Sequence, residues 1–597
     1  MSIHTLSRLL MLSIALLVLA PAALAQSDFG ESPPVDPPKM QLPGDGSGDV
    51  ELEFCDGDVC PGQTCDEVND RCVGNVTLQP GMGEPLAQLR TGERNRFFAG
   101  KDDFELNFTD DTGLGPVFNQ TSCASCHNTP VGGSGTIKVV RFGETDFQTN
   151  EFDPLAELGG SLWNRESLSP ECAEVIPFPP ANTFAERLTN STLGFGLVEA
   201  IADADIEANA ITPPPGVSGR VHIVPILEEP GMTAVGRFGW KSQLATVMSF
   251  SADASLQEMG ITSSVFPEDN PPNNDLDLLA ACDTAGDPET IPDANGVEFI
   301  DRITDFQRFL APPPQTPRSG MTGEAVFESI GCADCHVATF AARLSTEDDE
   351  LEDAISGRTL HPYSDFLLHD MGGSGDGIEQ GGAGMTELRT VPLWGLRVRD
   401  PLWHDGRVGG GTFTGRMSQV IQTHDATGSE AQASAQAFAA LDQADKDALF
   451  LFMDSLGRRE FDHDGDGDVD EDDTAAFEAC YTGPGSFYTP DDHCSISDVD
   501  QDGDVDDDDL ELHLVALGTV VDTGDDDGDE DGDDDNSSHA DSPVQPGGGG
   551  FQDLGPGGGD TAGGQETLGG TESAQPEERR RNERRKPSRV RQAHRGR

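Results

Sequence analysis

The chain has 597 residues, which is enough for several domains, and its net charge is -71. The charge is uneven: much of it lies between residues 462 and 541, whereas residues 577–597 are strongly basic. A basic tail can bind nucleic acid, but an exported protein rarely meets any. Because the first residues predict export, we expect no nucleic-acid partner and interpret this end as a solvated tail touching anionic surface material.

Residues 1–25 have the pattern of a secretory signal peptide. An arginine precedes an apolar run from Leu9 to Leu19, and Ala-Leu-Ala ends at Ala25, where cleavage is expected. The alternative is a membrane anchor, but the run is shorter than the roughly 20 residues that a span needs. The sequence therefore predicts a protein that is periplasmic, on the cell surface or secreted, without a transmembrane anchor.

Residues 26–50 are rich in Pro, Gly and Asp and read as a linker, and residues 51–75 contain four cysteines. We expect a small disulfide-rich module there, with a zinc site as the alternative, because disulfides persist outside the cell. Two further pairs of cysteines could form disulfides, which we infer only from their even number and their positions in the chain. The cysteines concerned are Cys55, Cys60, Cys65 and Cys72 in the module, and Cys172 with Cys282 and Cys480 with Cys494 as the two pairs.

Residues 80–458 form the main body, for which the apolar periodicity predicts a mainly α fold with long loops. We expect two cytochrome c-like haem domains, residues 80–318 and 319–458. The second is clearest: Phe327 and its neighbours predict a short amphipathic helix that stops at Gly331. The last helix is expected to begin at a capping Asp442 and to end at Gly457.

The pentad Cys-x-x-Cys-His occurs twice, within 118–130 and again 209 residues later. In this motif two thiols add to the haem vinyl groups and the histidine reaches the iron from the same face. The alternatives are a structural disulfide beside a bystander histidine and a redox-active cysteine pair, but two chance pentads are improbable. The motif predicts two covalent c-type haems, attached through Cys123, Cys126 and His127 and through Cys332, Cys335 and His336.

The second ligand of each iron decides between electron transfer and peroxide binding. Candidates for the second haem are His361, His369, Met371, His404 and His424. His424 falls on the apolar face of a predicted helix, where a core histidine is the alternative. Between the first pentad and residue 320 the one other histidine is His222, and this scarcity favours an open first haem.

Two acidic loops, 462–473 and 498–509, lie 36 residues apart and have the spacing of EF-hand-like calcium loops, each followed by a predicted helix. An acidic disordered tract, like residues 524–535, is the alternative, but it would not repeat Val469 and Val505 in register. Position 12 is Asp rather than the usual Glu. The expected ligands are Asp462, Asp464, Asp466, Asp468, Asp470, Asp473, Asp498, Asp500, Asp502, Asp504, Asp506 and Asp509. Residues 459–520 would form this module and 521–597 a disordered acidic, Gly-rich linker and basic tail.

Several stretches give the body a specific resemblance: GLGPVFNQTSCASCH (113–127), GRFGWKSQL (236–244), EMGIT (258–262), YSDFLLHDMG (363–372), LRTVPLWGL (388–396) and WHDGR (403–407). Residues 80–458 resemble the dihaem oxidoreductase family of peroxidases, also labelled thiol oxidoreductases, which is related to bacterial dihaem cytochrome c peroxidases and the methylamine-utilisation enzyme. The loops at 462–517 resemble dockerin-like repeats, which implies a cohesin-like or cell-surface partner.

The resemblance implies that peroxide reacts at the first haem and that electrons enter at the second from a small cytochrome or cupredoxin. Trp240 matches the tryptophan placed between the haems, and Glu258 matches the distal acid–base, with a surface charge as the alternative. His424 stands where these enzymes have Met or Tyr, and this departure implies a lower haem potential. Met371 is the second candidate ligand.

Three functions follow as hypotheses. The chain is a dihaem peroxidase-like enzyme, an electron carrier with both irons fully ligated, or a calcium-dependent surface or scaffold component. The label "thiol oxidoreductase" finds no support in the sequence, because no free reactive cysteine pair remains once the haem cysteines are assigned.

Overall fold

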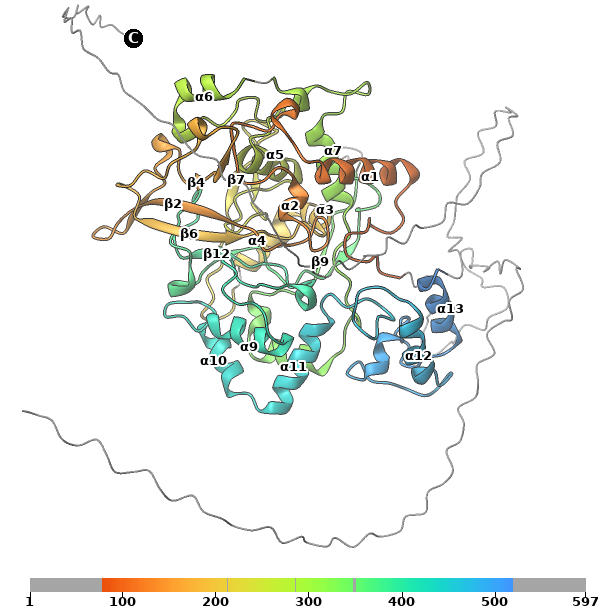
Figure 1. Ribbon diagram of the computed structural model, residues 1–597. Helices are drawn as coiled ribbons and strands as arrows, with labels where there is room; N and C mark the ends of the chain where they lie inside the picture. Colours follow the sequence, from red (N-terminus) through yellow and green to blue (C-terminus); the bar gives the residue numbers. More distant parts are fainter. Residues whose placement is uncertain (1–77, 212, 285, 347–350, 519–597) are drawn as a thin grey trace, which may run out of the picture. The chain divides into compact units, whose positions relative to one another are not determined.

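The computed structural model describes residues 78–211, 213–284, 286–346 and 351–518 (Figure 1). The predicted signal peptide, linker, disulfide-rich module and C-terminal tail therefore lie outside the described residues. The described part contains 13 α-helices and 12 strands, so helices are accompanied by several small sheets. No described helix has the length and apolar character needed to cross a membrane.

Around the first pentad, helices α1 (Thr91–Glu105), α3 (Phe195–Glu199), α5 (Val247–Met259) and α7 (Phe299–Phe309) pack together. Their contact is aromatic: Phe306 lies 5.1 Å from Phe97 and 4.9 Å from Phe104 between ring centroids. Gly100 permits the close approach, because a Cβ there would meet the carbonyl oxygen of Arg302 at 2.0 Å. The helices α4 (Asp203–Ile211) and α6 (Leu276–Cys282) lie outside this group of contacts.

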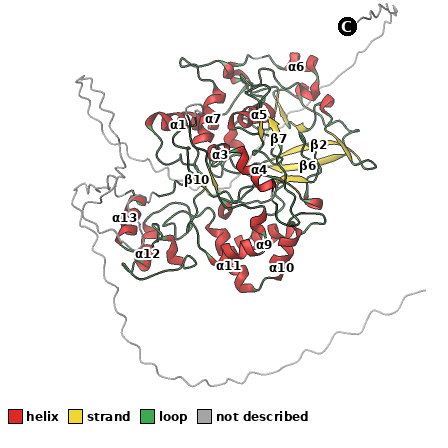
Figure 2. Ribbon diagram, turned by 180° about the vertical axis from the view of Figure 1, so that it is seen from behind, coloured by secondary structure: helices red, strands yellow, loops and turns green. Residues whose placement is uncertain are grey.

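A four-stranded antiparallel sheet interrupts the helical body (Figure 2). Its centre is β2 (Lys138–Asp146), which pairs with β3 (Glu151–Asp153), β4 (Leu162–Trp163) and β6 (Thr183–Leu188). The expectation of a mainly α body did not include this sheet. It matters for the site because β2 and the end of β6 lead directly toward the first pentad.

The other strands form two-stranded antiparallel pairs. They are β1 (Val117–Phe118) with β5 (Glu166–Ser167), β7 (Ile223–Pro225) with β8 (Thr233–Val235), β9 (Phe340–Ala341) with β10 (Thr359–Leu360), and β11 (Leu368–Asp370) with β12 (Glu387–Arg389). Such short pairs fix long loops without adding a second extended sheet.

The second pentad lies among α8 (Thr322–Ser329), α9 (Phe413–Thr423), α10 (Gln432–Ala440) and α11 (Gln443–Ser455). The predicted short helix before this pentad is α8, and Gly331 beyond it has a φ of 81°. The predicted cap is also confirmed, because the Asp442 side chain accepts a hydrogen bond from the Asp445 N–H. Phe327 and Phe452 join α8 to α11 in a shared core.

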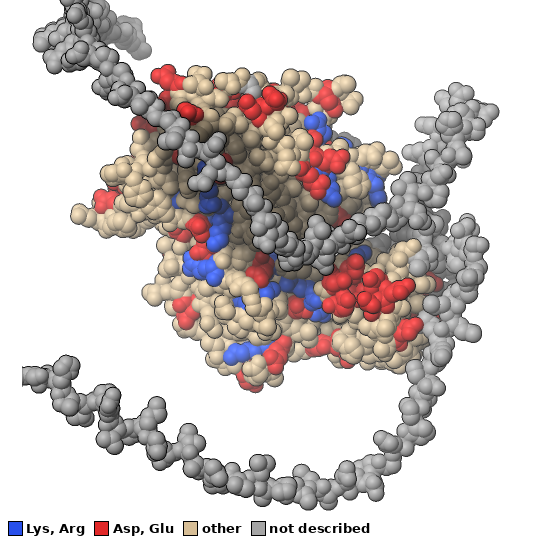
Figure 3. Space-filling model, viewed as in Figure 1, with Lys and Arg blue, Asp and Glu red and all other residues tan. Residues whose placement is uncertain are grey.

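The C-terminal module contains α12 (Glu471–Cys480) and α13 (Asp507–Ala516), each directly after an acidic loop. Its small core includes Phe461, Phe477 and the two repeated residues Val469 and Val505. Acidic side chains gather densely over this module in Figure 3.

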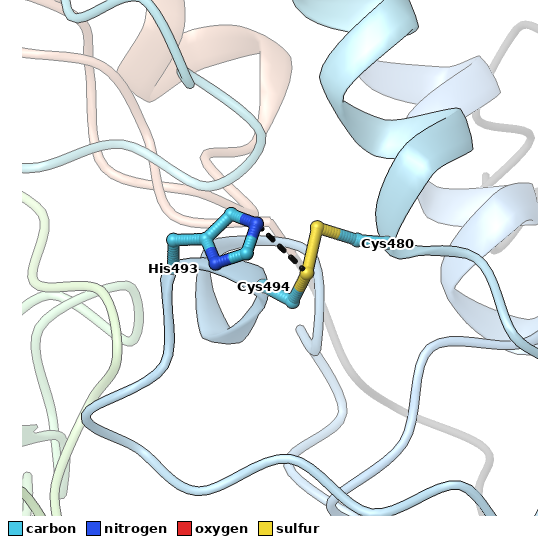
Figure 4. A group of neighbouring side chains, drawn as sticks. All are labelled: Cys480, His493 and Cys494. Carbon is cyan, nitrogen blue, oxygen red and sulfur yellow. Dashed lines mark hydrogen bonds between the residues drawn. A yellow bond between two sulfur atoms is a disulfide. The ribbon is translucent and has the colours of Figure 1, made fainter. Parts of the chain in front are cut away.

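Both disulfides anticipated in the body and the module are present, Cys172–Cys282 and Cys480–Cys494. Figure 4 shows the second of them with His493, whose Nε2 lies 3.5 Å from the Cys494 sulfur. These three residues resemble a metal-ligand group, but both sulfurs are used in the disulfide. We therefore assign no metal site to them.

Candidate haem sites

The first pentad forms one helical turn, α2 (Cys123–Cys126), which begins at Ser122. The Ser122 hydroxyl accepts a hydrogen bond from the Ser125 N–H and so closes the turn. His127 follows directly, with its Nδ1 3.1 Å from the carbonyl oxygen of Gly133. A ring nitrogen that faces a carbonyl carries the proton, so the contact with Gly133 places the proton of a neutral His127 on Nδ1.

The thiols of the two pentads are free. In the described residues four cysteines form the two disulfides, and the four free ones are those of the pentads. Burial raises the pKa of Cys123, Cys126 and Cys332 to about 12, so these thiols are protonated at neutral pH. A structural disulfide is absent and a reactive dithiol is disfavoured, which leaves the thiols available for attachment to a cofactor.

Glu258 lies beside the first pentad. It stands one residue before the end of α5, and the chain that carries Asn119 runs against this end. Here the Gly115 N–H donates to the carbonyl oxygen of Met259 at 3.1 Å, and the Asn119 N–H to that of Glu258 at 2.7 Å. The approach requires glycine, since a Cβ on Gly115 would lie 2.6 Å from Gly260.

The charge of the Glu258 carboxylate acts on the first pentad, since after burial it is the next cause that raises the pKa of the Cys126 thiol. Burial raises the pKa of Glu258 itself, while the Arg141 guanidinium and a hydrogen bond from Asn119 oppose the shift. A carboxyl group whose pKa is raised holds its proton more readily than an exposed one, which suits a group that takes up and returns a proton.

Trp240 lies at the second site and reaches toward the first. It lines the cavity that contains the second pentad, and its indole N–H donates to the carbonyl oxygen of Leu188 at 2.8 Å. The next residue, Thr189, hydrogen-bonds through its side chain to Cys126 of the first pentad. One contact and a short piece of chain therefore connect Trp240 with the first pentad.

The second pentad lines a cavity of about 170 Å³. His336 and His424 both line it. His336 Nδ1 lies 2.8 Å from the carbonyl oxygen of Tyr363, and His424 Nδ1 lies 2.8 Å from that of Val420. In both rings the Nε2 lone pair is therefore free, which is the arrangement of a histidine that binds a metal.

The wall of this cavity also fits the rest of a haem. Three buried nitrogens of the wall lack a hydrogen-bond partner among the described residues: Arg399 Nε, Trp403 Nε1 and His404 Nδ1. Burial lowers the pKa of Arg399 to about 10, so its guanidinium stays charged at neutral pH. A haem has two carboxylates that can accept hydrogen bonds from such donors, and orphaned buried donors are otherwise costly.

The other ligand candidates of the second site differ in availability. His369 is fully engaged, because its Nε2 lies 2.8 Å from Asp365 and its Nδ1 lies 2.8 Å from Glu430. Burial lowers the pKa of His369, but the hydrogen bonds that its ring donates to these carboxylates raise it to about 12. Met371 and His404 line the cavity, and His361 does not. His222 contacts the carbonyl oxygen of Lys241 at 2.9 Å, away from the first pentad.

Replacement of His424 by methionine is expected to raise the reduction potential of the second haem. Methionine stabilises ferrous iron relative to imidazole, and the change is on the order of 100 mV. A spectroelectrochemical titration measures it. Met371→Leu is the matched control from the same cavity and should leave the potential in place. The opposite result, with a shift in Met371→Leu and none in His424→Met, would assign the ligand to Met371.

Each acidic loop of the C-terminal module brings three carboxylates together, at positions 1, 3 and 5 of the first loop and at positions 1, 3 and 12 of the second. Asp462, Asp464 and Asp466 converge in the first loop, and Asp498, Asp500 and Asp509 in the second, with ligand atoms within 4.8 Å of one another in each group. The glycine at position 6 of each loop has a positive φ, which lies outside the range that other residues favour: 102° at Gly467 and 99° at Gly503. That is the position at which an EF-hand loop needs its sharp turn.

The last aspartate of each loop closes it in the same way. Asp473 accepts hydrogen bonds from the N–H groups of His463 at 2.7 Å and Asp470 at 3.1 Å. Asp509 accepts from Val499 at 2.7 Å and Asp506 at 3.1 Å. The two loops are thus a structural repeat, not an irregular acidic tract.

Comparison with known protein families gives one match. Residues 182–456 match the family described as "Di-haem oxidoreductase, putative peroxidase". The match identifies a haem-dependent oxidoreductase. The matched segment contains Trp240, Glu258, the second pentad and His424, whereas the first pentad precedes it.

Solved structures that are similar to the chain include a MauG-like protein associated with microbial copper homeostasis, with 14% identity over 64% of this chain and 92% of that chain and a TM-score of 0.29. A hydrazine synthase of Kuenenia stuttgartiensis gives 13% identity over 65% and 98%, with a TM-score of 0.27. At these values neither similarity supports an argument about fold or function. No curated protein matches the chain.

Proposed function

We propose that the chain is an exported dihaem c-type oxidoreductase that is peroxidase-like. Electrons would enter at the second haem from a small cytochrome or cupredoxin, and hydrogen peroxide or another oxidant would react at the first. The observation that supports this most strongly is the difference between the two pentads. The second shares its cavity with His424, whereas the first has Glu258 near enough for its charge to raise the pKa of the Cys126 thiol.

A bound c-type haem supplies an iron that transfers electrons and, where one side is open, binds peroxide. The chain's own residues supply the proton chemistry and the positions. His127 and His336 would hold one side of each haem, with Nδ1 fixed by a carbonyl oxygen. Glu258 would take a proton from one oxygen of hydrogen peroxide and return it to the other, so that the O–O bond breaks with water as the leaving group. Trp240 would connect the two sites.

Electron paramagnetic resonance of the oxidised and the half-reduced protein tests this proposal. We expect a high-spin ferric signal from the first haem in at least one of the two states, because that iron would have an open side. Two low-spin signals in both states would mean that both irons are fully ligated. That outcome would favour a dihaem electron-transfer protein without peroxidase activity.

We also propose that the C-terminal module, residues 459–520, binds calcium through its two loops and serves as a dockerin-like attachment to a cohesin-like or cell-surface partner. The carboxylates that converge in each loop and the two glycines of positive φ support calcium binding. An enzyme and an attachment module are compatible functions in one chain.

Removal of calcium is expected to destabilise this module. Without the ion the converging carboxylates repel one another, and a ligand at 100 times its Kd contributes about 2.7 kcal/mol. Calorimetry with calcium and with EDTA measures the change. A double variant, Asp466→Asn with Asp502→Asn, should show a smaller difference between the two conditions. An unfolding temperature that EDTA leaves unchanged would contradict calcium binding.

A further inference from the structure

The carboxylate of Glu258 is held at only one of its two oxygens. Asn119 Nδ2 donates to Oε2 at 2.9 Å, and in the described part of the chain Oε1 has no hydrogen-bond partner. Asn119 stands four residues before Cys123 and is 6% exposed. The two oxygens of one carboxyl group thus lie in different chemical surroundings.

The direction of this hydrogen bond is fixed by the neighbours of Asn119. Its Oδ1 accepts from the Arg165 N–H at 3.3 Å, so its amide nitrogen must be the group that faces Glu258. The same nitrogen donates to Asn164 Oδ1 at 3.2 Å. Asn164 is held in turn by its own N–H, which donates to Glu174 Oε2 at 2.8 Å. Because an amide nitrogen only donates, Oε2 of Glu258 must accept.

We propose that Asn119 is a positioning residue that reserves Oε2 of Glu258 as a hydrogen-bond acceptor and leaves Oε1 as the oxygen that exchanges a proton with peroxide. This inference rests on the proposed function and deepens it. Reduction of hydrogen peroxide breaks the O–O bond, consumes two electrons from the donor protein and two protons from solvent, and gives two waters. Oε1 carries one proton from the first oxygen to the leaving one and ends the cycle unchanged.

The charges around Glu258 decide how easily Oε1 can act. Arg141 comes from β2, Arg165 from the loop between β4 and β5, and Asp253 from α5 itself, while Glu258 in turn raises the pKa of Cys126 in α2. The two arginines favour the ionised carboxylate and Asp253 disfavours it. Arg141 Nη1 also donates to Ser161 Oγ at 3.3 Å, which ties this charge to the sheet.

The test is a pH titration of the Glu258 carboxyl group by infrared difference spectroscopy, with Glu258→Gln identifying its band. In Asn119→Leu the pKa of Glu258 should rise by about one pH unit, since the carboxylate loses a hydrogen-bond donor that stabilises its charged form. In Asn119→Asp it should move further, because a like charge is added while the size of the side chain is kept. The acid limb of kcat/KM for peroxide should move with the band.

The control is Asn182→Leu, which removes an amide that bonds only to Thr145 and Thr183 in the sheet, and it should leave the titration in place. Haem content and unfolding temperature check that each variant is folded. If Glu258→Gln is inactive but the titration is unmoved in both Asn119 variants, this inference is wrong and the proposed function stands. Full turnover in Glu258→Gln would overturn both.

Discussion

If the proposed dihaem attachment is right, replacement of Cys123 and Cys126 by serine leaves one covalent haem in place of two and abolishes peroxide turnover. Serine cannot form the thioether bonds, and the single turn of α2 offers His127 alone as a remaining anchor. The second haem should remain, because its pentad lies among different helices. Haem staining after denaturing electrophoresis and the pyridine haemochrome absorbance measure the number of covalent haems per chain.

The matched control replaces a cysteine pair that is not part of a pentad. Cys172→Ser with Cys282→Ser removes the Cys172–Cys282 disulfide and should leave both haems in place. This double substitution is expected to lower the free energy of unfolding by about 2–5 kcal/mol, the usual effect of removing a native disulfide. Two covalent haems in the Cys123/Cys126 variant would contradict the assignment of the first pentad.

The features that the sequence predicted well are local. The cap at Asp442 and the end of α8 before Gly331 depend on residues within one helical turn. The two acidic loops were predictable for the same reason, since their spacing and the glycine at position 6 lie within 12 residues. Such features need no knowledge of the rest of the fold.

The four-stranded sheet was not predicted, and the pattern of β2 explains why. Along Lys138–Asp146 the side chains do not alternate between buried and exposed, because β2 is central and is covered in part on both faces. The alternation by which a half-buried strand is recognised is therefore absent. From the sequence alone, such a central strand cannot be distinguished from the loops and helices around it.

The contacts that shape the two sites span long stretches of chain. Asn119 meets Glu258 across 139 residues, and Glu430 meets His369 across 61. A sequence read alone can list His369 beside His424 as possible ligands. Only the fold reveals that both nitrogens of His369 are already engaged, whereas the Nε2 of His424 remains free.

Glu258→Gln is expected to lower kcat/KM for hydrogen peroxide by about 10²–10⁴-fold, which is the usual contribution of a positioned acid–base. Glutamine keeps the size of the side chain and can still accept a hydrogen bond from Asn119, so the local structure should persist. It cannot take a proton from one oxygen and return it to the other. Stopped-flow kinetics with a reduced donor protein measures the loss.

The control lies in the loop between β7 and β8 and contacts the opposite end of α5. Glu228 accepts hydrogen bonds from Thr246 and Ser249 at the first turn of α5, whereas Glu258 stands at the last turn. Glu228→Gln therefore changes the same functional group without touching the first pentad, and its peroxide kinetics should stay within a factor of about three, the ordinary scatter of a substitution outside the site. Equal rates in Glu258→Gln and the unmodified enzyme would mean that the proton moves through another group or through solvent. A loss in both variants would instead point to α5 as a whole.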